Sequence, residues 1–262
     1  MSTIQVDNLV KQYGSSDAAV MAVRGIKFEV QSAELIAIMG ESGSGKSTLL
    51  SMMGALNTPT SGKYRVDEID VYALGQEKRA DFRRKFLGFI FQSFHLIPYL
   101  TVRENVMLPL APVKMKGKEK RDLAEEALRR VGLAGKTHRL PSQISGGEQE
   151  RVAIARAIVN RPPILLADEP TGNLDTKTSD EIMNLLQGLN SDGMTIIMVT
   201  HSPRNAQFAH RIIQLKDGEV QSFSDTGKSR LSGIKEKGGD GSFLLKGRMI
   251  VPGPELKAGF EY

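Results

Sequence analysis

Apolar residues in the first part of the chain alternate with polar residues over short stretches. Residues 3–10 and 24–30 show this alternation, which is typical of strands with one solvated face. Residues 63–71 continue the pattern, with Tyr64, Val66 and Ile69 at the expected inward positions. We therefore expect an antiparallel β layer formed by this part of the chain.

Three other stretches are almost entirely apolar and predict buried strands: residues 34–39, 163–167 and 194–200. Helical periodicity follows the first two of them, over residues 46–56 and 177–189. Strands that alternate with helices in this way indicate an α/β fold with a mainly parallel sheet.

Residues 76–160 are richer in charge and in helix formers than the sequence on either side. Within this segment, residues 118–131 place Leu123, Ala127 and Leu128 on one face, and Gly132 stands where a C-terminal glycine cap belongs. We expect an inserted α-helical subdomain at about 76–160, within a domain that spans residues 1–224.

Residues 225–262 contain many glycines among scattered charges, which predicts a loosely attached C-terminal extension. Its basic side chains could contact lipid headgroups, but a solvated extension is the simpler interpretation. These side chains are Lys228, Arg230, Lys235 and Lys237.

Composition narrows the class of protein. The chain has 262 residues, of which 40% are hydrophobic and 25% charged, as in an ordinary globular protein. It has no cysteine, so disulfides and thiolate metal sites are excluded, and with no signal-peptide pattern this favours the cytosol. The apolar runs are too short to cross a membrane, so a membrane role would need a partner chain. A net charge of +5 is a mild excess that suits an anionic surface but usually reflects solvated side chains.

The residues between the first apolar run and the first helical segment fit the phosphate-loop pattern G-x-x-x-x-G-K-[ST]. They are Gly40, Glu41, Ser42, Gly43, Ser44, Gly45, Lys46 and Ser47, followed by Thr48. Glycines let backbone N–H groups converge on phosphates, and the helix N-terminus adds positive potential. We expect Lys46 to reach the terminal phosphates of a nucleotide and the Ser47 hydroxyl to bind Mg²⁺.

Each of the three apolar runs ends in polar residues. The first ends in the phosphate loop, the second in Asp168 and Glu169, and the third in His201. Because ligands of open α/β sheets bind at the carboxyl ends of the strands, we expect these residues to share one site. Asp168 would belong to the Mg²⁺ shell, Glu169 would orient or deprotonate an attacking water, and His201 would contact the γ-phosphate or that water. Helix capping by the carboxylates and a plain surface histidine are the structural alternatives.

A second element suited to phosphate begins at Ser145, Gly146 and Gly147 and runs directly into a helical segment. Ser145 and Glu148 fit a capping box, and a well-capped helix is the plain interpretation. Two glycines at a helix N-terminus also leave backbone donors open to an anion. Because this element is far from Lys46 in the sequence, it could serve the nucleotide of another subunit.

Together these motifs resemble the ATP-binding subunits of ABC transporters, over about residues 3–222. The element at Ser145 is similar to the signature motif of that family. The resemblance implies an ATPase with a phosphate-loop NTPase core, an antiparallel β subdomain and a helical subdomain. It also implies ATP and Mg²⁺ as cofactors, paired ATP-binding subunits, a separate transmembrane permease, and a peripheral location at the cytoplasmic face of the inner membrane.

The resemblance also implies roles for single residues. Gln92 is similar to the Q-loop glutamine, which touches Mg²⁺ and reports the nucleotide state to the membrane partner. Tyr13 matches the aromatic residue that stacks on adenine, and Asp175 lies in a segment that looks like the D-loop. The magnesium-shell acid, the catalytic carboxylate and the switch histidine correspond to Asp168, Glu169 and His201.

Two positions depart from the family pattern. Ile144 replaces a leucine of similar volume, and Glu148 replaces a glutamine, although a carboxylate near a triphosphate would repel it. The capping box answers this, because Glu148 would point back to the Ser145 backbone. Details of the motifs resemble the branch of lipoprotein-releasing and macrolide-export ATPases, and cell-division ATPases look similar. The expected cargo of that branch is a lipoprotein, lipid, peptide or drug-like molecule.

We expect two copies to pair head to tail, so that each ATP lies between the phosphate loop of one copy and residues 145–147 of the other. A DNA-repair type ATPase shares these motifs, but it would have long coiled coils between them, so no nucleic acid is expected. A small-molecule kinase would explain the phosphate loop but would leave the element at Ser145 without a purpose.

Overall fold

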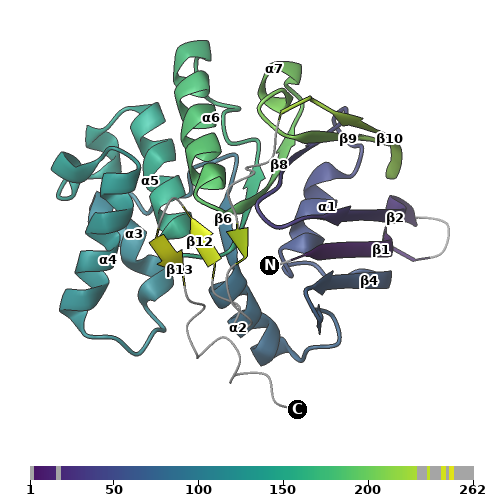
Figure 1. Cartoon of the computed structure of the whole chain (residues 1–262), viewed down its shortest axis with the longest axis horizontal. Coiled ribbons are helices and arrows are strands. Elements are labelled where there is room, and N and C mark those ends of the chain that lie inside the picture. The colour runs from purple at the N-terminus through teal and green to yellow at the C-terminus, as the bar shows by residue number, and fades with distance from the viewer. Residues whose placement is uncertain (1–2, 16–18, 229–234, 237–242, 246–247, 251–262) are drawn as a thin grey trace.

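The computed structural model describes residues 3–15, 19–228, 235–236, 243–245 and 248–250. Within these residues the chain forms an α/β core, an antiparallel sheet and a group of helices. Figure 1 shows the antiparallel strands β1, β2 and β4 on one side of the core and the helices α3, α4 and α5 on the other. None of the described helices combines the length and the apolar character needed to span a bilayer.

The large sheet has six described strands in the order β10-β9-β3-β8-β7-β6. β10 runs antiparallel to β9, and the other neighbouring pairs are parallel. The mainly parallel sheet expected from the sequence is therefore confirmed. The strands are β3 (Leu35–Met39), β6 (Leu87–Ile90), β7 (Ile164–Asp168), β8 (Thr195–Thr200), β9 (Arg211–Lys216) and β10 (Glu219–Asp225).

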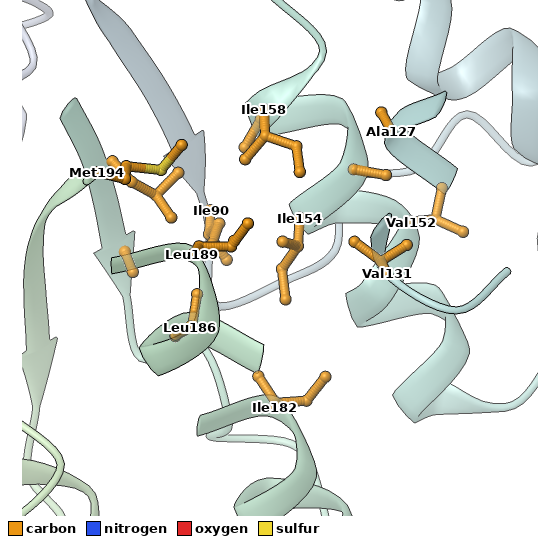
Figure 2. Close-up of a cluster of buried hydrophobic side chains, with 14 of the residues drawn as sticks. Ile90, Ala127, Val131, Val152, Ile154, Ile158, Ile182, Leu186, Leu189 and Met194 are labelled. Carbon is orange, nitrogen blue, oxygen red and sulfur yellow. The ribbon is translucent and has the colours of Figure 1, made fainter. Parts of the chain in front are cut away.

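Both faces of the central strands β3, β7 and β8 are covered, which explains why these strands are almost entirely apolar. Ile36 and Ile38 of β3 pack toward α1 and the antiparallel sheet, whereas Leu35 and Ala37 pack toward the helices on the opposite face. Figure 2 shows part of the core that contains Leu35 and Ala37, where side chains of α5 and α6 meet beside Ile90 of β6. Burial of each large aliphatic side chain in such a core contributes about 1.5–3 kcal/mol.

The antiparallel sheet has the order β2-β1-β4-β5. Tyr64 and Val66 are fully buried, as the alternation predicts. The first two strands are longer than the sequence pattern indicated: β1 continues to Tyr13, and β2 begins at Val20. The strands of this sheet are β1 (Ile4–Tyr13), β2 (Val20–Val30), β4 (Ser61–Val66) and β5 (Ile69–Asp70).

The segment expected to be helical, residues 76–160, also contains a strand of the large sheet. β6 lies at the sheet edge beside β7, and Phe82 and Phe86 of the preceding helix α2 pack in the same core as α1. The segment is therefore not wholly helical, because β6 separates α2 from α3, α4 and α5, which form the helical part of the molecule. The helices of the segment are α2 (Gln76–Phe86), α3 (Val102–Met107), α4 (Gly117–Arg130) and α5 (Gly146–Ile158), with short 3-10 turns η2 (Leu108–Leu110), η3 (Ala134–Lys136) and η4 (Pro141–Gln143).

The other helices lie against the core. They are α1 (Lys46–Met53), α6 (Thr176–Ser191) and α7 (Pro203–Ala206). β9 and β10 form a hairpin, whose turn residues Asp217 and Gly218 both have positive φ.

The packed fold continues past the expected boundary at residue 224. The Thr226 hydroxyl donates to the Ala209 carbonyl oxygen at 2.6 Å, and the Lys228 amino group lies 4.8 Å from the centre of the Phe208 ring. Further on, the described residues form a small antiparallel sheet of β11 (Lys235–Glu236), β12 (Phe243–Leu245) and β13 (Arg248–Ile250). Of the basic residues considered for lipid contact, Arg230 and Lys237 lie outside the described residues.

Candidate active site

The carboxyl ends of β3, β8 and β7 lie side by side in the large sheet and bring the predicted site residues together. A cavity of about 580 Å³ opens at these ends. Most of its walls come from residues named from the sequence alone. It is lined by Ala22, Ser42, Gly43, Gly45, Lys46, Ser47, Thr48, Gln92, Glu169 and His201.

The phosphate loop depends on its glycines. Gly43 and Gly45 have φ values of 81° and 95°, a region that other residues rarely adopt. A Cβ atom on Gly45 would also lie 2.2 Å from the carbonyl oxygen of Ala22 on β2. At Gly45 the loop is therefore packed directly against the backbone of β2, and only a residue without a side chain fits there.

Lys46 is almost fully buried, with 8% of its surface exposed. Its amino group donates to the carbonyl oxygens of Gly40 at 2.8 Å and Glu41 at 2.7 Å. These bonds hold the positive charge inside the curve of the loop. A cation at this place complements the charge of a terminal phosphate.

Ser47 lines the cavity, and its hydroxyl donates to Asp168 Oδ1 at 3.3 Å, although Asp168 itself does not line the cavity. Burial raises the pKa of Asp168 and nearby Glu169 raises it further, while the bond from Ser47 and the charge of Lys46 act in the opposite direction. A hydroxyl and a carboxylate are hard oxygen donors of the kind that Mg²⁺ prefers. The described residues contain no group of three or more ligating side chains that would hold a metal alone. The donor set thus fits an ion that shares its shell with phosphate oxygens and water.

Glu169 and His201 form a close pair at the mouth of the cavity. His201 Nδ1 lies 2.8 Å from Glu169 Oε1, a distance at which the imidazole N–H donates to the carboxylate. The side chain of Glu169 is only 13% exposed, and that of His201 is 69% exposed. Glu169 has a φ of 50°, an uncommon value for a residue with a side chain, and its N–H donates to the Val199 carbonyl oxygen at 3.0 Å.

Gln92 follows β6 and reaches the cavity from the side of the helical part. The Asn173 side-chain amide donates to the Gln92 carbonyl oxygen at 2.9 Å. The segment after Gln92 is thereby tied to the loop after Glu169.

Tyr13 lies at the end of β1 and does not line this cavity. Its ring is 43% exposed, and the Lys11 amino group lies 5.0 Å from the ring centre. Its hydroxyl accepts a hydrogen bond from the Asn57 side chain. Tyr13 is therefore exposed enough to contact a base. Stacking on adenine stays a prediction.

Ser145 caps α5 as predicted. Its hydroxyl accepts from the Glu148 N–H at 3.3 Å, and its own N–H donates to Glu148 Oε2 at 3.0 Å. Glu148 also accepts a hydrogen bond from Lys136, and this bond, together with those from Ser145, lowers the pKa of the carboxylate. The capping box is therefore confirmed, and the carboxylate is directed back toward the backbone of Ser145.

The second phosphate element does not join the first within this chain. Ser145, Gly146, Gly147 and Asp175 do not line the cavity of the phosphate loop. Asp175 instead caps α6, where it accepts from the Thr178 N–H at 3.0 Å and from the Thr178 hydroxyl at 2.6 Å. These bonds lower the pKa of Asp175.

Two features of the site were not predicted from the sequence, namely one wall residue and one bond between loops. Ala22 lines the cavity but carries no chemistry that a pattern could reveal. Asn173 ties its loop to Gln92, although the two are separated by 81 positions in the sequence. Both depend on contacts between segments that are far apart in the sequence.

Comparison with known proteins places this site in a family. Residues 23–172 match the family model described as "ABC transporter". The uncharacterized ABC transporter ATP-binding protein YvrO of Bacillus subtilis is 46% identical over 83% of this chain and 95% of its own length. The macrolide export ATP-binding/permease protein MacB of Syntrophobacter fumaroxidans is 45% identical over 84% of this chain, which corresponds to 31% of MacB.

Solved structures give the same result. A dimeric structure of MJ0796, titled a bacterial ABC transporter cassette, superposes with a TM-score of 0.79 at 44% identity, over 86% of this chain and all of that one. A second dimeric structure of MJ0796, in a post-hydrolysis state bound to ADP and Pi, also has a TM-score of 0.79, at 43% identity over 86% of this chain and 100% of that one. The chain belongs to the ABC transporter family, as an ATP-binding and ATP-hydrolysing cassette.

Proposed function

We propose that two copies of this chain close around two ATP molecules and so drive a conformational change in a separate transmembrane permease. The observation that carries the proposal is the separation of the two phosphate elements. The loop with Lys46 lines one cavity with Glu169 and His201, whereas Ser145 begins a helix that does not reach that cavity. A second copy would supply its Ser145 element to the open side of the first.

In each half-site the backbone N–H groups of residues 40–48 and the Lys46 amino group would bind the β- and γ-phosphates. Tyr13 would stack on the adenine, since its ring is exposed near the end of β1. Ser47, Gln92 and Asp168 would hold Mg²⁺, directly or through water. The ion, when bound, would neutralise charge on the phosphate oxygens.

Glu169 would orient the attacking water and accept its proton. Its carboxylate is partly buried next to the phosphate loop, and its bond from His201 fixes one oxygen, which leaves the other to face the water. His201 would also lie close to the γ-phosphate. Lys46 and the backbone donors of the loop would stabilise the charge that develops in the transition state.

Across the dimer interface, residues 145–147 would donate backbone N–H groups to the γ-phosphate of the other copy. Asp175 lies at the N-terminus of the neighbouring helix α6 and would contact the partner in the same closed state. The dimeric structure of MJ0796, a cassette that is 44% identical to this chain, supports the pairing of two copies.

A groove of about 540 Å³ between α2, β6 and the helical part is the surface that we assign to the permease. Its walls are largely apolar, with Phe89, Phe91 and Leu108, and Arg83 and Arg156 stand among them. An amphipathic helix with an acidic edge would fit this combination. The groove begins directly beside Gln92, so that residues 92–105 would transmit the nucleotide state to the permease.

We place the chain at the cytoplasmic face of the inner membrane, where it would be bound peripherally through its permease. The MacB relatives, which are ATP-binding/permease proteins, support an association with a permease. We propose export or extraction of a lipoprotein, lipid, peptide or drug-like molecule as the output. The permease would select the cargo, and this chain would supply the energy of ATP.

The substitution Glu169→Gln tests the proposal on the purified full-length chain. With Mg²⁺ and ATP, turnover is expected to fall at least 100-fold while ATP-induced dimers accumulate, because binding is kept and the proton acceptor is lost. The matched control is Glu181→Gln, which removes an exposed ion pair with Arg151 on the neighbouring helix and should leave turnover unchanged. Native turnover in Glu169→Gln would refute the assignment of the base.

A further inference from the structure

The Glu169–His201 pair stands on two loops that leave the large sheet at neighbouring strand ends. Asp168 of β7 and Val199 of β8 are still in register, and the Glu169 N–H still bonds to the Val199 carbonyl oxygen. The two loops leave the sheet after Asp168 and after Thr200. Because the His201 side chain is 69% exposed, burial alone does not fix its ring over the carboxylate.

A hydrogen bond directly behind the pair joins the two loops. The Asn205 side-chain amide donates to the Thr171 hydroxyl oxygen at 2.6 Å. Thr171 is two residues after Glu169, and Asn205 is four residues after His201. Each of the two bonded residues is only 7% exposed, so water does not readily replace the bond.

Asn205 is itself held in place by the start of α7. Its N–H donates to the Ser202 hydroxyl at 3.3 Å, and the Ser202 N–H donates to the Thr200 hydroxyl at 3.1 Å. A continuous set of bonds thus runs from the end of β8, past His201, to Asn205 and across to Thr171. The loop of His201 is fixed relative to the loop of Glu169 by this last step.

The loops have room to move if the bond is absent. A second cavity, of about 210 Å³, lies between them, and its walls include Glu169, His201, Thr171 and Asn205. Glu169 and His201 therefore separate this cavity from the nucleotide cavity. Thr171 and Asn205 line only the second one.

We propose that Asn205 is a positioning residue for hydrolysis, which acts through its bond to Thr171 and keeps His201 on the Glu169 carboxylate. The proposal rests on the proposed role of Glu169 as the base. Loss of the bond lets the loops relax into the second cavity. The Glu169 carboxylate is then no longer held in the orientation that activates the attacking water. Turnover falls while ATP affinity is kept, since neither Thr171 nor Asn205 lines the nucleotide cavity.

Two near-isosteric substitutions test the bond in the full-length chain. Thr171→Val and Asn205→Leu should each lower kcat by about 5- to 20-fold with KM for ATP within about twofold of the native value. Thr171→Ser keeps the hydroxyl and should retain kcat within about twofold. The double variant Thr171→Val with Asn205→Leu should be no slower than the slower single variant, because both changes remove the same bond. Native kcat in both single variants, or multiplied losses in the double variant, would overturn the proposal.

A spectroscopic measurement separates positioning from the chemistry of Glu169. The ¹⁵N-resolved NMR signal of the His201 imidazole, assigned with His201→Ala, should show a hydrogen-bonded Nδ1–H in the native chain and in Thr171→Ser, and should lose it in Asn205→Leu. Arg204→Gln is the matched control on the same helix, since its exposed ion pair with Asp180 should not matter. An unchanged His201 signal in Asn205→Leu overturns the positioning role even if Glu169 is the base. Native turnover in Glu169→Gln refutes the base itself.

Discussion

Lys136 and Glu148 form an ion pair at the start of α5, next to the cap made by Ser145. Glu148 occupies a position where the family has glutamine, so its charge would oppose a triphosphate bound nearby. The bond from Lys136 neutralises this charge while the capping box turns the carboxylate toward the Ser145 backbone. The ion pair therefore reduces the repulsion that Glu148 would exert on a phosphate bound at the N-terminus of α5.

Replacement of Lys136 by Met should weaken closure of the dimer around ATP. Both side chains are partly exposed, at 44% and 25%, so the pair is worth at most about 1 kcal/mol, equivalent to a fewfold loss in dimer affinity. The ATP-induced dimer of the Glu169→Gln variant, measured by sedimentation, provides the readout. Addition of Glu148→Gln should restore affinity by removing the charge that Lys136 offsets. A deficit that persisted in that combination would contradict the electrostatic explanation.

Gly147 has no room for a side chain, because a Cβ atom there would lie 2.4 Å from Thr178 Cγ2. Rotation of the Thr178 side chain away from Gly147 would break the bond that its hydroxyl donates to Asp175 at the start of α6. Gly147→Ala should therefore lower the free energy of unfolding by about 1–2 kcal/mol, measured by urea denaturation.

Two variants isolate the cause of this effect. Thr178→Ser removes Cγ2 and keeps the hydroxyl, so it should restore most of the stability of Gly147→Ala. At Gly146 a Cβ atom would meet only Leu174 Cδ2 at 3.8 Å, so Gly146→Ala should be tolerated in the same assay. Equal losses at Gly146 and Gly147 would show that contact with Thr178 is not the reason.

The phosphate loop and the residues after β7 and β8 were predictable because their signals are local. A strand, a glycine-rich turn and a helix follow one another without interruption, and polar residues at strand ends need only the rule that parallel strands end on the same edge. In the structure Lys46, Glu169 and His201 line one cavity, as this rule predicts.

Other features depend on contacts between distant segments and left no local signal. β6 was absorbed into the expected helical segment because Leu87–Ile90 is short and follows α2 directly. Its Gly88 lies so close to α5 that a Cβ atom would be 2.4 Å from the Ala157 carbonyl oxygen, a constraint set by tertiary packing. The bond between Thr171 and Asn205 likewise joins residues 34 positions apart.

Tyr13 provides a test of base stacking. Tyr13→Ala should weaken ATP binding about tenfold, since stacking of an aromatic side chain on a base is worth about 1–3 kcal/mol, and kcat at saturating ATP should change little. Tyr13→Phe keeps the ring and loses only the bond from Asn57, so its affinity should be close to native. Binding of a fluorescent ATP analogue measures both variants. Equal affinities of the Ala and Phe variants would exclude a role for the ring.

Glu150 on α5 should make the stability of the protein depend on pH. It is 1% exposed, and its Oε1 has no hydrogen-bond partner among the described residues. Burial raises its pKa to about 8, against an opposite effect of Arg156. The folded state therefore binds a proton that the unfolded state has already released above a pH of about 4.5. Stability should fall as the pH rises from about 4.5 to about 8, because the native carboxyl keeps its proton across this range.

Glu150→Gln removes this titration while it keeps the shape of the side chain. At pH 8 the variant should be more stable than the native chain by about 1–3 kcal/mol. This is less than the full shift of the Glu150 pKa implies, because the surrounding groups relax when the buried carboxyl ionises. At pH 5 the difference should shrink to a small fraction of that value, since the native Glu150 is then neutral in the folded state. Thermal unfolding at pH 5, 6.5 and 8 measures the effect, with the exposed Glu181→Gln as a control. A difference between Glu150→Gln and the native chain that is the same at all three pH values would refute the titration of Glu150.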